Sequence, residues 1–248
     1  MTPCFKTAGV LISKQTMIKL AFLGTKGEIE EETPVHRFHS SMTVESGGTK
    51  LLVDYGLLHR YSLDEIALDA ILITHAHPDH YSWLKEDVPT DIPVYLTQES
   101  LDYGKFRPRN AHVVAPMEQF KVGAFDCMAY RVIHSIRCPA VGWKLMVAGK
   151  TLVYNSDLVD IVEKDAMLAG VDCYIGDGSA IKANLVRRQG DVLFGHTRII
   201  TQVHWCEKHG IKHMIFNHLG KETLREEENF KAEHPGVIFA YDGLEMEI

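Results

Sequence analysis

The strongest constraint on this chain is a cluster of metal-binding side chains placed directly after an apolar segment. Residues 71–73 are Ile-Leu-Ile, typical of a buried strand, and the chain continues as Thr-His-Ala-His-Pro-Asp-His. In a turn after a strand, His75 and His77 can point to one side, whereas Asp79 and His80 point elsewhere along the turn. The segment can therefore serve two metals rather than one, and neutral imidazole and carboxylate groups are ligands for Zn²⁺, Mn²⁺ and iron. The alternative is a surface turn that is merely rich in histidine, which explains the dense spacing poorly.

Composition and charge exclude several classes of protein. Of the 248 residues, 46% are hydrophobic and 24% are charged, which is ordinary for a globular domain. Acidic residues outnumber basic ones by 33 to 26, so nucleic acid could be held only by a local patch. No apolar run reaches the roughly 20 residues needed to cross a bilayer, so we expect no membrane association. The 5 cysteines are scattered without C-x-x-C spacing, which favours reduced thiols and a cytoplasmic protein over a disulfide framework.

The order of predicted elements indicates an α/β fold in which two sheets pack together with helices outside. No repeat or linker divides the chain, and Met17 directly precedes a strong strand pattern. We therefore expect residues 1–16 to be an N-terminal extension and residues 17–248 to form one domain. Runs rich in Val, Ile and Leu predict strands at 18–24, 41–46, 50–54, 70–74, 93–97, 111–115, 125–133, 141–147, 151–155, 172–176, 213–217 and 237–241. Capping residues and periodicity predict helices at 62–68, 158–169, 198–209 and 221–232.

The segment at 74–80 resembles the signature of the metallo-β-lactamase fold superfamily, and four further motifs resemble that family in the same order. These motifs are LLVDYG at 51–56, VIHS at 132–135, VYNSD at 153–157 and IFNHLG at 215–220. The resemblance extends over about residues 18–241, nearly the whole chain. It implies a four-layer αββα sandwich that belongs to a hydrolase.

The resemblance also implies how the metal ligands are shared between two divalent ions, with Zn²⁺ favoured and Mn²⁺ or iron also accepted. The first ion would be held by His75, His77 and His134, and the second by Asp79, His80 and His218. Asp157 would bridge both ions, and a water between them would become a hydroxide nucleophile near neutral pH, with Asp79 also counted among the catalytic residues. By the same resemblance Asp54 orients the signature loop, although a simple cap at a strand end explains it equally well.

The identity of the ligands narrows the chemistry. The signature has Asp79 among the ligands of the second metal, whereas β-lactamases of this fold usually depart from this ligand pattern there. The pattern resembles the branch that includes tRNase Z, phosphodiesterases and lactonases. A phosphodiester suits two metals because they can stabilise the attacking and the leaving oxygen together. Hydrolysis of a lactone, thioester or amide on the same metals is the alternative. A metal-binding or nucleotide-binding protein without enzymatic activity is a third hypothesis.

His196 favours the phosphodiester hypothesis. The segment LFGHT at 193–197 resembles the additional histidine motif of the tRNase Z and phosphodiesterase branch, in which such a histidine acts on the leaving group. A protonated imidazole could donate to a leaving alkoxide, so we predict a catalytic role for His196. A structural histidine packed at the start of a helix is the alternative.

Two interpretations apply to each of the other polar groups near these motifs. The loop with His36 and His39 could overhang the metals and bring Arg37 within reach of a phosphate. In the other interpretation it is a solvated loop with one buried histidine. Asp177 and Ser179 follow a predicted strand and could support the site or face the substrate, or else form only a tight turn.

Departures from tRNase Z limit the substrate. The chain has no long Gly/Pro-rich arm of the kind that grips tRNA, and its net charge is −7. Lys182, Arg187 and Arg188 form the best local basic cluster, which is a solvated face in the simpler interpretation. We therefore expect a small phosphodiester or a nucleotide as substrate and leave nucleic acid open. A homodimer is compatible with the resemblance because dimers are common in this fold.

Overall fold

Two mixed β-sheets form the centre of the molecule, for which a computed structural model describes residues 17–248. The strands of the first sheet, in spatial order, are β17 (Glu245–Glu247), β1 (Lys19–Gly24), β2 (Ser41–Ser46), β3 (Thr49–Val53), β4 (Ala70–Leu72), β5 (Val94–Leu96) and β6 (Ala111–Val113). From β17 to β3 neighbouring strands are antiparallel, and from β3 to β6 they are parallel. The parallel strands β3 and β4 therefore end at the same edge of the sheet.

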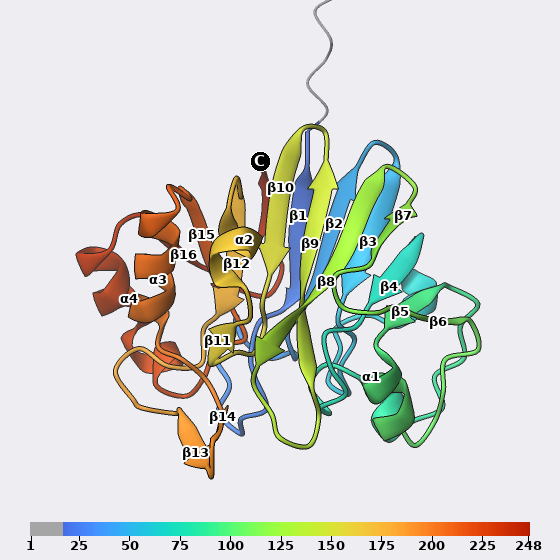
Figure 1. The fold of residues 1–248 in the computed structure, drawn as a ribbon, viewed down its shortest axis with the longest axis horizontal. Helices are drawn as coiled ribbons and strands as arrows, with labels where there is room; N and C mark the ends of the chain where they lie inside the picture. The colour runs from blue at the N-terminus through green and yellow to red at the C-terminus, as the bar shows by residue number, and fades with distance from the viewer. Residues whose placement is uncertain (1–16) are drawn as a thin grey trace, which may run out of the picture.

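The second sheet contains the longest strands. In spatial order these are β11 (Asp160–Ile161), β8 (Phe125–Ile133), β9 (Ala140–Val147), β10 (Lys150–Tyr154), β12 (Cys173–Asp177), β15 (His213–Asn217) and β16 (Val237–Phe239), and β7 (Gln119–Val122) pairs with β8. Strands β10, β12, β15 and β16 run parallel, so their carboxyl ends share one edge. A separate hairpin, β13 (Arg187–Gln189) and β14 (Val192–Phe194), projects from the body of the molecule (Figure 1).

Helices cover the outer side of each sheet. Next to the second sheet lie α2 (Lys164–Leu168), α3 (Ile199–Lys208) and α4 (Thr223–Glu233), and α1 (Gln98–Tyr103) lies beside the first sheet (Figure 1). Short 3₁₀ turns occur at Leu63–Glu65 and Ser82–Leu84. The predicted αββα sandwich is thereby confirmed. Within residues 17–248, no helix combines the length and the apolar character needed to traverse a bilayer.

A continuous apolar core between the two sheets holds this sandwich together. Phe22, Val44 and Leu51 from the first sheet share this core with Trp143 and Leu145 from the second, and all are buried. Burying one such side chain contributes about 1.5–3 kcal/mol relative to leaving it exposed. Because alternate residues of each strand point to opposite faces, the other faces pack against the helices in two further clusters.

The elements differ from the sequence-based prediction mainly at short segments. The helix predicted at 158–169 is wrong over its first half, where β11 (Asp160–Ile161) pairs with Val132 and Ile133 of β8. Only Lys164–Leu168 is helical, because the preceding backbone N–H groups bond to the neighbouring strand, as Val162 N–H does to Arg131 O. Helix α1 and strands β7, β13, β14 and β17 were not predicted, and the expected extension 1–16 lies outside the described residues.

The core between the sheets predicts unequal costs for two leucine truncations. Leu51 is fully buried in β3, whereas Leu58 is 41% exposed. We expect Leu51→Ala to lower the free energy of unfolding by about 2–5 kcal/mol, because it leaves a cavity between the sheets, and Leu58→Ala to lower it by less than about 1 kcal/mol. Urea denaturation of both variants at equal metal loading measures this difference, and equal costs would contradict the assignment of the core.

Candidate metal centre

The ends of strands from both sheets converge on one group of ionisable side chains. Strand β4 leads into the loop that carries His75–His80, β8 leads to His134, β10 to Asp157 and β15 to His218. Side chains that follow strands of a packed sandwich stand on a rigid frame, which is what a metal site requires. His218 has a backbone φ of 54°, in the left-handed region that residues with a Cβ rarely adopt. Such strain is retained when the surrounding structure fixes the residue and is common at functional sites.

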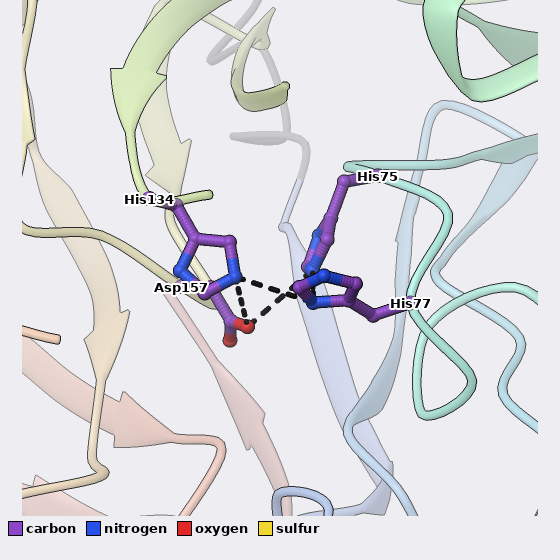
Figure 2. A group of neighbouring side chains, drawn as sticks. All are labelled: His75, His77, His134 and Asp157. Carbon is purple, nitrogen blue, oxygen red and sulfur yellow. Dashed lines mark hydrogen bonds and ion pairs between the residues drawn. The ribbon is translucent and has the colours of Figure 1, made fainter. Parts of the chain in front are cut away.

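The first group of ligand-type atoms comprises three imidazoles and one carboxylate, shown in Figure 2. His77 Nδ1 lies 2.9 Å from His75 Nε2 and 3.3 Å from His134 Nε2. Asp157 Oδ2 lies 3.4 Å from His75 Nε2 and 3.2 Å from His134 Nε2. Four atoms with lone pairs therefore face a common centre.

The second group uses the other oxygen of the same aspartate. Asp157 Oδ1 lies 3.0 Å from His218 Nε2 and 3.5 Å from His80 Nε2. Asp79 Oδ2 lies 3.0 Å from His218 Nε2 and 3.3 Å from His80 Nε2. Asp157 thus contributes one oxygen to each group, and the structure brings together every residue that the sequence predicted as a ligand.

These distances are compatible with metal ligation as well as with hydrogen bonding within the protein. Four ligands about 2.0–2.1 Å from a zinc ion in a tetrahedron lie about 3.3–3.4 Å apart, close to the separations seen in both groups. His80 Nε2 and Asp157 Oδ1 are buried and have no hydrogen-bond partner. A buried polar atom without a partner costs about 1–3 kcal/mol, so a bound cation is the natural partner for both atoms.

The second nitrogen of four imidazoles is already engaged, which fixes the nitrogen that faces the centre. The partners of Nδ1 are Thr74 Oγ1 for His75 at 3.1 Å, Asp54 Oδ2 for His80 at 2.8 Å, Gly195 O for His134 at 3.1 Å and Ser179 Oγ for His218 at 2.9 Å. If Nδ1–H donates in each pair, Nε2 keeps its lone pair for a metal. Metal-binding histidines usually have such a partner.

Burial and charge set the protonation of the imidazoles in two different ways. Burial lowers the pKa of His75, of His77 and, to about 4, of His134, so these rings are neutral at pH 7. Burial also opposes the charged form of His80 and His218, but nearby carboxylates outweigh it and raise the pKa of both, that of His218 to about 10. The carboxylates around these two rings thus favour positive charge, which divalent ions would supply.

Asp54 holds the loop at 74–80 by hydrogen bonds to both of its ends. Its fully buried carboxylate accepts hydrogen bonds from Thr74 N–H at 2.8 Å, from the Thr74 hydroxyl at 2.9 Å and from His80 Nδ1–H. One carboxylate therefore fixes both ends of the turn that carries the ligands. This geometry favours the role of an orienting residue over that of a simple strand-end cap.

A second aspartate organises His196. Asp177 Oδ2 accepts a hydrogen bond of 2.8 Å from His196 Nδ1–H, and its other oxygen accepts the Ser179 N–H at 2.9 Å. Ser179 Oγ lies 3.2 Å from His196 Nδ1 and also contacts His218. Burial opposes protonation of His196, but Asp177 outweighs it and raises the pKa of the imidazole. Asp177 and Ser179 thus join His196 to the second ligand group.

The remaining candidates separate into those near the site and those away from it. His36 is buried away from the ligands, with Nδ1 2.9 Å from Thr25 Oγ1, and the Arg37 guanidinium lies over the Phe38 ring. His39 accepts a hydrogen bond from Leu58 N–H, and burial lowers its pKa to about 4. Of the three residues predicted to form a basic cluster, Lys182 lies beside the ligand groups, in the wall of the same cleft. Arg187 and Arg188 lie on the hairpin of β13 and β14.

Gly27 is a contributor that the sequence analysis did not identify. A Cβ at this position would lie 2.8 Å from His218 Cε1 and 2.9 Å from His218 Nε2, closer than such atoms approach. Gly27 N–H also donates to Leu219 O. Only glycine therefore lets the loop after β1 pass beside the imidazole, and a single sequence contains no signal for this contact between distant segments.

The ligand groups open into a cleft of about 740 Å³. One part of its wall comprises the site residues His77, Asp79, His134, Asp157, Ser179, His196 and His218. The rest comprises the loop at 27–29, the residues Lys182, Ala183 and Leu185, the loop at 220–222, and Arg225 and Glu226 of α4. A cleft of this size holds a small organic molecule or a nucleotide.

Comparison with known proteins identifies the family. The model of the beta-lactamase superfamily domain matches residues 37–175, which is more than half of the chain and includes both His75–His80 and Asp157. The chain belongs to the beta-lactamase superfamily. Within this superfamily its fold is the metallo-β-lactamase fold, as the sequence predicted.

Three relatives illustrate the similarity. Ribonuclease Z from Methanopyrus kandleri is 23% identical over 278 residues, covering 92% of this chain and 97% of the relative. A diphosphatase of the PhnP family has a TM-score of 0.71 and 22% identity, covering 94% of this chain and 97% of that one. Zn²⁺-bound PqqB from Methylobacterium extorquens has a TM-score of 0.70 and 19% identity, covering 93% of this chain and 100% of that one. At these identities the solved structures establish the fold alone.

The contact of Gly27 predicts a metal-binding defect from a very small change. We expect Gly27→Ala to displace the His218 ring and lower metal affinity about 10- to 100-fold, the usual effect of disturbing the support of a ligand. The matched control is Gly236→Ala, because a Cβ there would meet only Met214 Cε at 3.6 Å. Metal content after dialysis against a competing chelator measures the effect. Equal metal retention by both variants would contradict the assigned contact.

Proposed function

We propose that this protein is a dinuclear metal-dependent hydrolase that cleaves phosphodiester bonds. The observation that carries the proposal is the shared carboxylate of Asp157, whose two oxygens each complete one group of ligand-type atoms. Two adjacent cations suit the transfer of a phosphoryl group because charge develops on the attacking and the leaving oxygen together. Both sites open into one cleft, so a single substrate can meet both.

Zinc is the proposed metal at both positions. The first group, with its three imidazoles and one carboxylate oxygen, matches the donors that zinc prefers, and its imidazoles are neutral at pH 7. In this assignment Asp79, His80 and His218 would hold the second ion, and Asp157 would offer one carboxylate oxygen to each ion. When bound, the ions would supply Lewis acidity and lower the pKa of a bound water.

The residues of the chain contribute binding, orientation and proton transfer. Asp177 accepts a hydrogen bond from His196 Nδ1–H, which leaves Nε2 to serve as the proton donor toward the substrate. Asp177 raises the pKa of His196 and so favours the protonated ring, which is the form that can donate a proton to a leaving alkoxide. Asp54 and Ser179 hold the adjacent imidazoles, so the ligands stay fixed while the phosphate changes geometry.

The relatives support the chemical class. One is named a ribonuclease and another a diphosphatase, and both names describe cleavage at phosphorus. In this chain the dyad of His196 and Asp177 adds a donor for the leaving group, which a poor leaving group needs more than an activated ester does. This dyad suits the alkoxide leaving group of a phosphodiester, and the paired ligand groups and the names of the relatives favour this class over a lactone, thioester or amide.

Turnover by metal-reconstituted protein tests the proposal directly. Chelator-treated protein should be inactive, and addition of Zn²⁺ or Mn²⁺ should restore hydrolysis of bis-p-nitrophenyl phosphate. A panel of lactones and thioesters, assayed with the same preparation, provides the comparison. Rapid hydrolysis of a lactone or thioester without phosphodiester turnover at any metal loading would overturn the proposed substrate class.

The role proposed for His196 predicts a dependence on the leaving group. We expect His196→Ala to slow hydrolysis of an alkyl phosphodiester by about 10²–10⁴-fold, the usual contribution of a general acid. Hydrolysis of a p-nitrophenyl ester should slow far less, since p-nitrophenolate leaves without receiving a proton. His204→Ala, which removes an exposed histidine of α3, is the matched control. Equal losses with both esters would show that His196 has only a structural role.

A further inference from the structure

Three cationic side chains line the cleft beyond the ligand groups and have no role in the proposed chemistry. They are Lys182, Lys221 and Arg225. Lys221 follows His218 by three residues, and Lys182 follows Ser179 by three residues. Three residues span at most about 10–11 Å, so both lysines are anchored within one small molecule's length of the site. The cleft of about 740 Å³ is also much larger than a single phosphate requires.

The backbone that carries Lys182 is held firmly. Glu222 Oε2 accepts hydrogen bonds from the N–H groups of Ile181 at 2.9 Å, Lys182 at 3.0 Å and Ala183 at 2.9 Å. Burial opposes ionisation of Glu222, but these three donors outweigh it and lower the pKa of the carboxyl. The start of α4 and the segment at 181–183 therefore form one unit, and this unit presents cations from both of its parts to the cleft.

The carboxylates near these cations compete only weakly with a ligand. Lys182 Nζ lies 3.9 Å from Glu226, and Arg225 lies 3.9 Å from Glu31, which also pairs with Lys221. The side chains of Lys182, Lys221 and Arg225 are 77%, 55% and 65% exposed. Exposed ion pairs of this kind contribute little to stability, so a dianionic phosphate can replace the carboxylates as partner.

We propose that Lys182, Lys221 and Arg225 form an anion subsite that binds a second phosphoryl group of the substrate while the scissile phosphodiester lies at the ligand groups. This inference rests on the proposed function and specifies its substrate class, a small molecule that carries both a phosphodiester and a separate phosphate. An arginine and two lysines are the side chains that bind phosphate oxygens in proteins. The three cations thus determine specificity rather than the chemical step.

The surroundings of the subsite favour one phosphate over a polynucleotide strand. Acidic side chains lie close to it, because Glu28, Glu222 and Glu226 line the same cleft and Glu31 pairs with Lys221. Successive phosphates of a strand would meet these carboxylates, and like charges repel. The net charge of −7 adds no long-range attraction for a polyanionic strand.

A pair of matched substrates tests the subsite in the zinc-reconstituted protein. The pair is the p-nitrophenyl ester of thymidine monophosphate with and without a second phosphate on the sugar. We expect kcat/KM to be about 10- to 100-fold higher for the doubly phosphorylated ester, which is the effect of one or two charge-assisted hydrogen bonds. The double variant Lys182→Gln/Arg225→Gln should reduce this ratio to near 1. Lys231→Gln on α4, whose lysine pairs with Glu228 outside the cleft lining, should keep the wild-type ratio.

Binding provides a second measurement that does not depend on turnover. By calorimetry, thymidine bisphosphate should bind the zinc-reconstituted protein about 10- to 100-fold more tightly than thymidine monophosphate, and the double variant should lose this difference. The substituted side chains are exposed, so the variants are expected to fold, and circular dichroism checks this.

The outcomes separate the inference from the function on which it rests. Equal kcat/KM for the two esters, with brisk turnover of both, would overturn the subsite and leave the phosphodiesterase proposal intact. Turnover of neither ester would overturn the phosphodiesterase proposal and this use of the subsite with it. Faster cleavage of oligothymidylate than of the doubly phosphorylated ester would assign the cations to a polynucleotide and would also overturn the inference.

Discussion

The structure depends on one electrostatic constraint, the burial of several carboxylates around a single point. Asp54, Asp79, Asp157 and Asp177 are all buried within the same group of side chains. Buried charge costs several kcal/mol unless it is paired and hydrogen-bonded, and such carboxylates therefore require positive charge close by. Asp157 is the clearest case, because imidazoles face both of its oxygens and one oxygen has no hydrogen-bond partner. A pair of divalent cations would satisfy the constraint and would supply the proposed chemistry.

The sandwich supplies the rigidity that this arrangement needs. The apolar core between the sheets fixes the strands, and the strand ends fix the ligands. Hydrogen bonds from Asp54, Ser179 and the Gly195 carbonyl then fix the individual imidazoles. The outer part of the cleft is built differently, from loops and the start of α4, and so it can vary between relatives without disturbing the ligands. This division explains how one fold can keep its metal chemistry and change its substrate.

Much of the site could be predicted from the sequence because its residues occur in compact motifs at the ends of apolar strands. His75, His77, Asp79 and His80 are visible in one turn, and the resemblance supplied His134, Asp157 and His218. Gly27 and Glu222 were not predicted, because each acts on a segment far away in the chain and has an ordinary sequence context. The helix predicted at 158–169 failed for a related reason, since pairing with β8 outweighed local propensity at Asp160–Ile161. Local patterns therefore reveal ligands and long strands, whereas close packing and strand-edge pairing depend on the tertiary structure.

Anomalous scattering from crystals of the zinc-reconstituted protein, recorded at the zinc absorption edge, measures the central claim most directly. We expect two zinc ions per chain, one on either side of the Asp157 carboxylate, with His134 at the first and His218 at the second. A single ion, or two ions without Asp157 between them, would contradict this expectation.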